Sequence, residues 1–192
     1  MSAATARGPG VDRAREVRVA LRRLVAEGGF HGASMGAVAK AAGVGTGTAY
    51  VHYASKDELV VAAYLETKRE LGLAATRGGD PDAPPRERFI ALWLAVHEHF
   101  AKNASDARFL VQVEHSPYFA LAHETALAAD DDPLMAVATA PDVAALLAPL
   151  PLTVLWELGL APAVRLAAAG TVLTRRQLTA TAEACWRAIT TA

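Results

Sequence analysis

The sequence has little of what disulfide-rich, membrane and polyanion-binding proteins need. Its one cysteine, Cys185, cannot form a disulfide within the chain, so we expect a reducing compartment, the cytoplasm. No run of about 18 apolar residues is free of charges or helix breakers, so no membrane span is predicted. The first ten residues have no apolar segment, so we expect no secretory signal. A net charge of −1 does not by itself mark a nucleic-acid binder.

Charge is nevertheless divided unevenly along the 192 residues. Residues 1–60 contain eight Lys or Arg and five Asp or Glu, a net charge of +3, and the remainder carries −4. A basic first third on an acidic remainder fits a DNA-reading head on a larger body. Hydrophobic residues make up 53% of the chain and recur at helical spacing with no evident strand pattern, which predicts an all-α fold.

A stretch in the first third has the pattern of a helix-turn-helix. Ser34 can cap a short helix with apolar residues at helical spacing, and Gly43 can end it with a positive φ. A second short helix is predicted from about Thr46 to His52. Ser55 with Glu58 three residues later predicts the capping box of a third helix. Two short helices joined by a glycine turn form the motif that DNA-binding proteins use to place the second helix in a groove.

The second of these helices has an outer face of small or hydrogen-bonding residues. Ala49 and either Val51 or Tyr53 can face the core, while small residues let a duplex approach and Thr or Tyr can reach base edges or a thymine methyl. Lys56 lies at the positive end of the next helix, where an opposing anion such as a DNA phosphate is favourable. We therefore predict DNA contacts from Ser34, Gly45, Thr46, Gly47, Thr48, Tyr50, His52 and Lys56.

The first helix, predicted over about Val11–Glu27, combines an apolar stripe with a basic remainder. The stripe contains Val17, Leu21 and Val25, and the arginines left outside are Arg15, Arg18, Arg22 and Arg23. The simplest interpretation of these arginines is a solvated face. The alternative is that Arg7, Arg13 or Arg15 contacts phosphate.

The rest of the chain predicts a helical body. A long helix over about 56–77 precedes a Gly- and Pro-rich linker, and further helices are predicted over 86–102, 106–114, 117–129, 134–139 and 141–148. Leu152–Ala169 is nearly all apolar, and a last helix over 174–190 begins with a Thr174–Gln177 capping box. A helix that is apolar all round lies in a core or an interface, so we predict that 152–169 and 174–190 form a homodimer interface.

The helix-turn-helix residues also resemble a known family. Gly43-Val44, Gly47-Thr48-Ala49-Tyr50-Val51-His52-Tyr53 and Ser55-Lys56-Asp57-Glu58-Leu59 look like the TetR-type (tetracycline-repressor family) transcriptional regulators, over roughly the first third of the chain. Gly45 departs from the usual polar cap and Ala49 from the usual Leu. The resemblance implies an N-terminal three-helix DNA-binding domain, a C-terminal helical ligand-binding and dimerisation domain, and two heads that read a palindrome. We expect a tail over 1–10 and domains over 11–55 and 56–192.

The same resemblance implies a body pocket for an apolar or aromatic small-molecule effector. Its expected lining is Trp93, His97, Phe100, Phe109, Val113, Tyr118, Phe119 and Trp156, and the alternative for any one of them is ordinary aromatic core. His97 and His99 point apart on a helix, so neither a metal nor a cofactor is expected. Cys185 is interpreted as a packing residue.

The predicted function is that of a DNA-binding, ligand-responsive repressor and not an enzyme. Effector binding would shift the long helix that begins at Lys56, change the spacing of the two heads and release DNA, with equal coupling in both directions. Two alternatives stay open. One is an activator or a regulator without a small-molecule effector, and the other is a small helical enzyme that uses the body pocket. A salt-dependent gel shift separates the regulators from the enzyme.

Overall fold

The computed structural model describes residues 9–77, 79–129, 134, 137 and 139–191. Within these residues the chain forms helices and turns, with one isolated antiparallel bridge between Leu147 and Thr190. This confirms the all-α prediction. The α-helices are α1 (Pro9–Gly28), α2 (Met35–Ala41), α3 (Thr46–His52), α4 (Lys56–Ala75), α5 (Pro85–Lys102), α6 (Ala104–Glu114), α7 (Phe119–Leu127), α9 (Pro141–Ala144), α10 (Leu152–Gly159), α11 (Ala161–Ala168) and α12 (Arg175–Ile189), and a 3-10 turn covers Phe30–Gly32.

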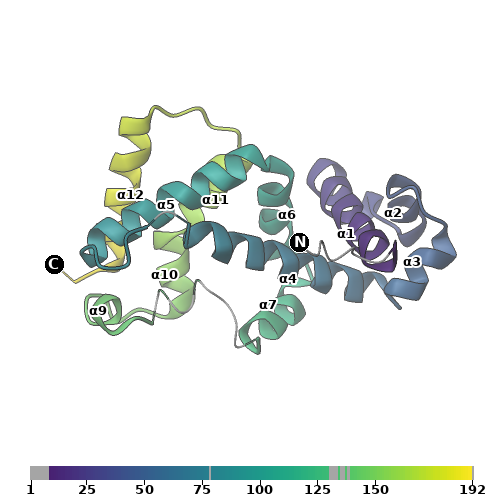
Figure 1. The fold of residues 1–192 in the computed structure, drawn as a ribbon, viewed down its shortest axis with the longest axis horizontal. Coiled ribbons are helices and arrows are strands. Elements are labelled where there is room, and N and C mark those ends of the chain that lie inside the picture. Colours follow the sequence, from purple (N-terminus) through teal and green to yellow (C-terminus); the bar gives the residue numbers. More distant parts are fainter. Residues whose placement is uncertain (1–8, 78, 130–133, 135–136, 138, 192) are drawn as a thin grey trace, which may run out of the picture.

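The helices form a small head and a larger body, and α4 runs from one into the other (Figure 1). The head consists of α1, α2 and α3, which pack on one another at one end of the molecule. α4 packs on α1 in the head and on α5 and α7 in the body. α1 also packs on α6, so two helices of the body contact the head. A movement of α4 or α6 would therefore change its packing contacts with α1 directly.

The body has an aromatic core between α5, α6 and α11. Trp93, Phe100, Phe109 and Val113 are fully buried there, and α11 packs on both α5 and α6. The indole N–H of Trp93 donates a hydrogen bond of 3.2 Å to the carbonyl of Gly159, at the end of α10. The core therefore fixes α10 to α5 through a buried polar contact.

Side chains at the starts of α4 and α12 satisfy backbone N–H groups that a helix leaves without partners. Ser55 accepts from the N–H of Glu58 at 3.1 Å, but the Glu58 carboxylate accepts from Ala54 instead of closing a capping box on Ser55. The Thr174–Gln177 capping box is confirmed, with both reciprocal hydrogen bonds present.

The single apolar helix predicted over Leu152–Ala169 is wrong, because the chain forms α10 and α11 there. Pro162 has no N–H to donate and its ring blocks the preceding turn, so one helix cannot continue through it. The two parts also differ in burial. The apolar side chains buried within the chain on α11 include Ala163, Val164 and Ala167, whereas those exposed on α10 are Leu152, Val154 and Leu158.

Other helix boundaries differ by a few residues. α1 begins at Pro9, two residues before the predicted start, and α6 begins at Ala104 and not at Asp106. The tail expected over 1–10 falls mostly outside the described residues, as does half of the helix expected over 134–139. Among the described helices, none combines the length and the apolar character that crossing a bilayer requires.

Candidate functional site

The helix-turn-helix forms with the predicted caps. Ser34 accepts a hydrogen bond from the N–H of Ala37 at 3.2 Å, which starts α2. Gly43 has a φ of +68°, the left-handed conformation that glycine adopts without steric cost. α3 follows over the predicted residues Thr46–His52, and its N-cap Gly45 provides no side-chain hydrogen bond. The turn chemistry therefore holds α2 and α3 in a helix-turn-helix.

One face of α3 is open to solvent. Tyr50 is 51% exposed, Thr46 and Gly47 are also exposed, and Thr48 and His52 are half-buried. Ala49 on the opposite side is fully buried. Gly45 and Ser34 lie exposed at the starts of α3 and α2. The structure thus places Thr46, Gly47 and Tyr50 at one accessible surface, with Thr48 and His52 half-buried at its sides and the positive end of that helix beside it.

Val51 is a residue of this surface that the sequence reasoning missed. It was one of two candidates for the inner face, but it is 82% exposed, whereas Tyr53 is buried. Its position four residues after Gly47 was the available signal, because residues four apart share a helix face.

Lys56, predicted to hold a phosphate, already has partners inside the protein. Its ammonium donates a 2.6 Å hydrogen bond to the carbonyl of Phe30 and lies 5.7 Å and 5.9 Å from the ring centroids of Phe30 and Tyr118. The two rings are 4.8 Å apart. Tyr118, expected in the pocket, thus connects the body to the head directly before α7.

Arg18 and Arg22 are not on a solvated face, so that interpretation is wrong for both. Arg22 is only 4% exposed and lies within 3.1–3.5 Å of Thr67, Glu70, Glu66 and Asp106 oxygens. Arg18 forms two hydrogen bonds with Glu66, of 3.0 and 2.8 Å. The arginines lie inside because α4 and α6 cover this side of α1 and supply carboxylates there.

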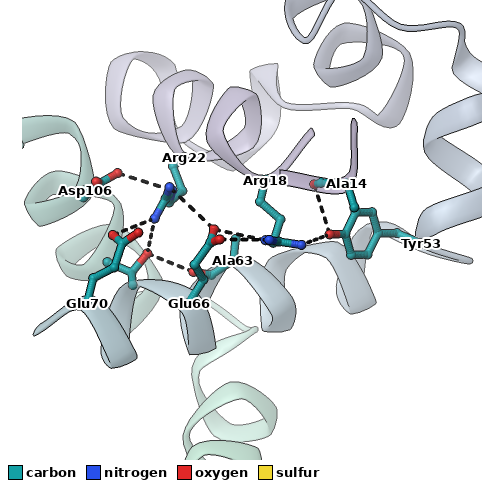
Figure 2. Close-up of polar contacts among 9 residues, drawn as sticks. Ala14, Arg18, Arg22, Tyr53, Ala63, Glu66, Glu70 and Asp106 are labelled. Carbon is teal, nitrogen blue, oxygen red and sulfur yellow. Dashed lines mark hydrogen bonds and ion pairs between the residues drawn. The ribbon is translucent and has the colours of Figure 1, made fainter. Parts of the chain in front are cut away.

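The polar network continues to Tyr53, the residue directly after α3 (Figure 2). Arg18 donates a 2.5 Å hydrogen bond to the hydroxyl of Tyr53, which donates in turn to the carbonyl of Ala14 at 3.1 Å. Hydrogen bonding to Glu66 raises the pKa of Arg18. Burial would raise the pKa of Glu66, but hydrogen bonds and charges from Arg18, with Arg22 adding to them, lower it overall. Arg18 and Glu66 are therefore held in their charged forms, and the network as a whole links α1 and α4 with Tyr53 after α3 and with Asp106 of α6.

A cavity of about 670 Å³ that is partly open to solvent lies in the body between α4, α5, α6, α7, α10 and α12. Of the eight side chains predicted for a pocket, Phe119 and Trp156 line it. Trp93, Phe100, Phe109 and Val113 lie in the core instead, where the ring of His97 stacks on Trp93 at 5.9 Å. Tyr64 and Lys68 of α4 and Leu110 of α6 also line the cavity. The sequence reasoning missed these three residues.

The described residues contain no group of three or more His, Cys, Asp or Glu side chains arranged to hold a metal ion. His97 and His99 are both partly shielded, and burial lowers the pKa of each. Burial likewise raises the pKa of the Cys185 thiol, which disfavours the nucleophilic thiolate.

Two family models match the chain. The model of the bacterial regulatory proteins of the tetR family matches residues 18–63, which include α2, α3 and the start of α4. The model of the tetracyclin repressor-like C-terminal domain matches residues 84–190. No curated protein matches the sequence.

Solved structures share the fold over nearly the whole chain. A TetR-family transcriptional regulator from Haemophilus influenzae RD is 27% identical with a TM-score of 0.79, covering 96% of this chain and 100% of that one. A putative TetR-family transcriptional regulator from Vibrio parahaemolyticus is 25% identical with a TM-score of 0.67, covering 94% and 100%. A TetR-family regulator from Marinobacter aquaeolei VT8, at 23% identity and a TM-score of 0.73 over 94% and 96%, shows likeness of fold alone.

Proposed function

The chain belongs to the TetR family of bacterial transcriptional regulators, and from that premise we propose that it is a ligand-responsive repressor that binds a palindromic operator as a homodimer. It is a regulator with a helix-turn-helix DNA-binding head. The observation that carries the finer proposal is the arrangement of α4, which contacts both the head and the cavity. The head over 11–55 reads DNA, and the rest over 56–192 binds effector and dimerises. A DNA-bound regulator acts in the cytoplasm.

The exposed face of α3 supports the DNA contacts. Thr46, Gly47 and Tyr50 are accessible, and a tyrosine can contact base edges or a thymine methyl in the major groove. Thr48 and His52 extend this surface, with Gly45 and Ser34 at its margin. Lys56 contributes more weakly than a free lysine, because its ammonium is bonded to Phe30 and would have to leave that carbonyl to reach a phosphate.

Exposed apolar side chains on α10 support the dimer. Leu152, Val154 and Leu158 are between one third and one half exposed, and a second copy of this surface would bury them together with the outer face of α12. The apolar residues of α11 contribute little, because the chain's own core already covers them. A two-fold axis through this surface would present two copies of α3 to a palindrome.

Two helices, α4 and α6, line the cavity and also contact α1 of the head. α4 contributes Tyr64 and Lys68 to the cavity wall, and its Glu66 and Glu70 to the arginines of α1. α6 repeats the arrangement, with Leu110 and Glu114 at the cavity and Asp106 beside Arg22. An effector that displaces either helix must strain the network that ends at Tyr53, directly after α3. Effector binding and operator binding then oppose each other by the same free energy.

The decisive experiment combines a gel shift with Tyr50→Ala. Operator sequence is first selected from random duplexes with the wild-type protein, and the salt slope measures the phosphate contacts. We expect Tyr50→Ala to weaken specific binding by about 1–3 kcal/mol without changing the dimer seen by light scattering. The matched control is Leu73→Ala, a similarly exposed side chain on α4, which should leave binding unchanged. Equal affinities for wild type and Tyr50→Ala would contradict the assignment of α3, and a monomer would contradict the dimer.

A further inference from the structure

A ring of the body and a ring of the head meet beside the first residue of α4. Tyr118, directly before α7, has its ring centroid 4.8 Å from that of Phe30, the residue that begins the 3-10 turn after α1. Gly29, with a φ of +69°, lets the chain turn at this point. α7 also packs on α4. The body therefore contacts the head here at a place separate from the arginine network of α1.

The ammonium of Lys56 lies against both rings. It is 5.7 Å from the ring centroid of Phe30 and 5.9 Å from that of Tyr118, within the distance of about 6 Å at which a ring face attracts a cation. It also donates a 2.6 Å hydrogen bond to the carbonyl of Phe30. Two rings and a carbonyl thus hold this ammonium, and of these groups the ring of Tyr118 is the one that belongs to the body.

The groups that hold Lys56 are all uncharged. The carbonyl and the rings attract the ammonium, but they do not neutralise its charge. The position makes this charge costly, because α4 begins at Lys56 and the positive end of a helix disfavours a cation. A DNA phosphate would neutralise the charge, so the ammonium has two alternative sites, one within the protein and one on a duplex.

Lys56 is near enough to α3 to reach the second site. α3 ends at His52 and α4 begins at Lys56, so the lysine lies just beyond the helix that faces DNA. Its side chain is half-buried and has a flexible four-carbon stem. Rotation about that stem moves the ammonium away from the rings while the backbone stays in place.

We propose that Tyr118 is a positioning residue that withholds Lys56 from DNA phosphate. The ammonium must leave both rings and the Phe30 carbonyl to contact DNA, and the ring of Tyr118 adds to the attraction that it gives up. The body thereby limits the number of phosphates that each head contacts. This inference rests on the DNA contacts proposed above and needs no effector.

Removing the ring of Tyr118 tests the proposal in a gel shift. Tyr118→Leu keeps an apolar side chain, and we expect it to bind both the selected operator and a random duplex about three- to tenfold more tightly. The salt slope should become steeper by about one to two units, because each protomer gains a phosphate contact. The ratio of the two affinities should not change, since phosphate contacts carry no sequence information. A disturbed α3 would instead lower that ratio.

Three comparisons assign the effect to the ring and to Lys56. Tyr118→Phe keeps the ring and should restore the affinity and salt slope of the wild type. Leu121→Ala, at a position of α7 that is 52% exposed, controls for truncation of a side chain on that helix and should also match the wild type. In protein that carries Lys56→Met, Tyr118→Leu should change neither quantity, because the ammonium is absent.

Nuclear magnetic resonance of the free protein gives a second measurement that needs no DNA. Protons over the face of an aromatic ring resonate upfield of their usual position. The ε-methylene signal of Lys56, identified by its loss in Lys56→Met, should therefore lie upfield of the signals of the exposed Lys40 and Lys102. It should move towards them in Tyr118→Leu.

The outcomes separate this inference from the proposed function. Unchanged or weaker DNA binding by Tyr118→Leu, with a salt slope that is not steeper, overturns the role of Tyr118 and leaves the DNA-binding surface of α3 standing. An equal gain of affinity in the Lys56→Met background also overturns it, as does an ordinary Lys56 signal in the free wild type. If the wild type binds no duplex, the proposed function is wrong and this inference falls with it.

Discussion

Replacing Arg22 with methionine isolates the contribution of the network between head and body. Methionine keeps an unbranched apolar side chain but removes the guanidinium, which is 4% exposed and contacts Glu66, Glu70 and Asp106. Glu66 retains its ion pair with Arg18, whereas Glu70 and Asp106 lose the positive charge that Arg22 supplied. The substitution therefore leaves two partly buried acids without this partner.

The magnitude follows from the burial of those acids. Removing one member of a fully buried ion pair costs about 3–5 kcal/mol. Here the side chains of Glu70 and Asp106 are 31% and 19% exposed, so water can partly solvate them. We expect Arg22→Met to lower the free energy of unfolding by about 2–4 kcal/mol. Arg23→Met, at the exposed neighbouring position, should stay within about 0.5 kcal/mol of the wild type.

The loss should depend on pH in a defined direction. Burial already raises the pKa of Glu70 and of Asp106 against the opposing charge of Arg22. Without Arg22 both values rise further above those of the unfolded chain, so the folded variant binds more protons and loses stability as pH increases. The difference between Arg22→Met and wild type should be smaller at about pH 5 than at about pH 8.

Urea unfolding at one protein concentration measures these differences, since association also contributes to apparent stability. A loss no larger for Arg22→Met than for Arg23→Met would refute the idea that the buried guanidinium holds the head to the body. A loss that grows as pH falls would refute the assignment of Glu70 and Asp106 as the groups left unpaired.

Three further substitutions concern the turn before α3, α3 itself and α12. Gly43→Ala should cost about 1–2 kcal/mol, because its φ of +68° is unfavourable for a side chain while no atom lies within 4 Å of the added Cβ. Gly47 has an ordinary φ and equally open surroundings, so Gly47→Ala should leave the free energy of unfolding unchanged or slightly higher. The same substitution should weaken DNA binding in the gel shift, because its methyl group lies on the exposed face of α3. A larger loss of stability for Gly47→Ala than for Gly43→Ala would contradict the roles given to both glycines. Thr174→Ala should lower the free energy of unfolding by about 1 kcal/mol, because α12 loses its capping box with Gln177, and an unchanged urea midpoint would contradict this.

Local signals in the sequence predicted the DNA-reading head well. The cap at Ser34, the glycine turn at Gly43 and the bounds of α3 depend on residues within a few positions of one another, so they can be read without knowing the rest of the fold. The same holds for the capping box at Thr174. Val51 shows the limit, since a valine inside a short helix suits either face and only the packing of α3 on α2 and α1 decides it.

The cavity could be predicted only as a property of the body and not residue by residue. Trp93, Phe100 and Phe109 have the same composition and spacing as a pocket lining, yet they fill the core between α5, α6 and α11. Whether an aromatic ring faces a void or another ring depends on how helices far apart in the sequence are placed. The break before Pro162 was, in contrast, visible in the sequence, because proline inside a helix removes a donor and blocks the preceding turn.

The burial of Arg18 and Arg22 had a signal that a helix-by-helix reading overlooks. The two arginines are four residues apart on α1, and their partners Glu66 and Glu70 are four residues apart on α4. Both pairs are separated by 48 residues, so the two helices run in the same direction where they meet and each row faces the other. A basic row on one amphipathic helix that matches an acidic row on another in spacing and order predicts contact between those helices. Such a match identifies charged residues that lie inside a molecule, which hydrophobic periodicity alone assigns to the surface.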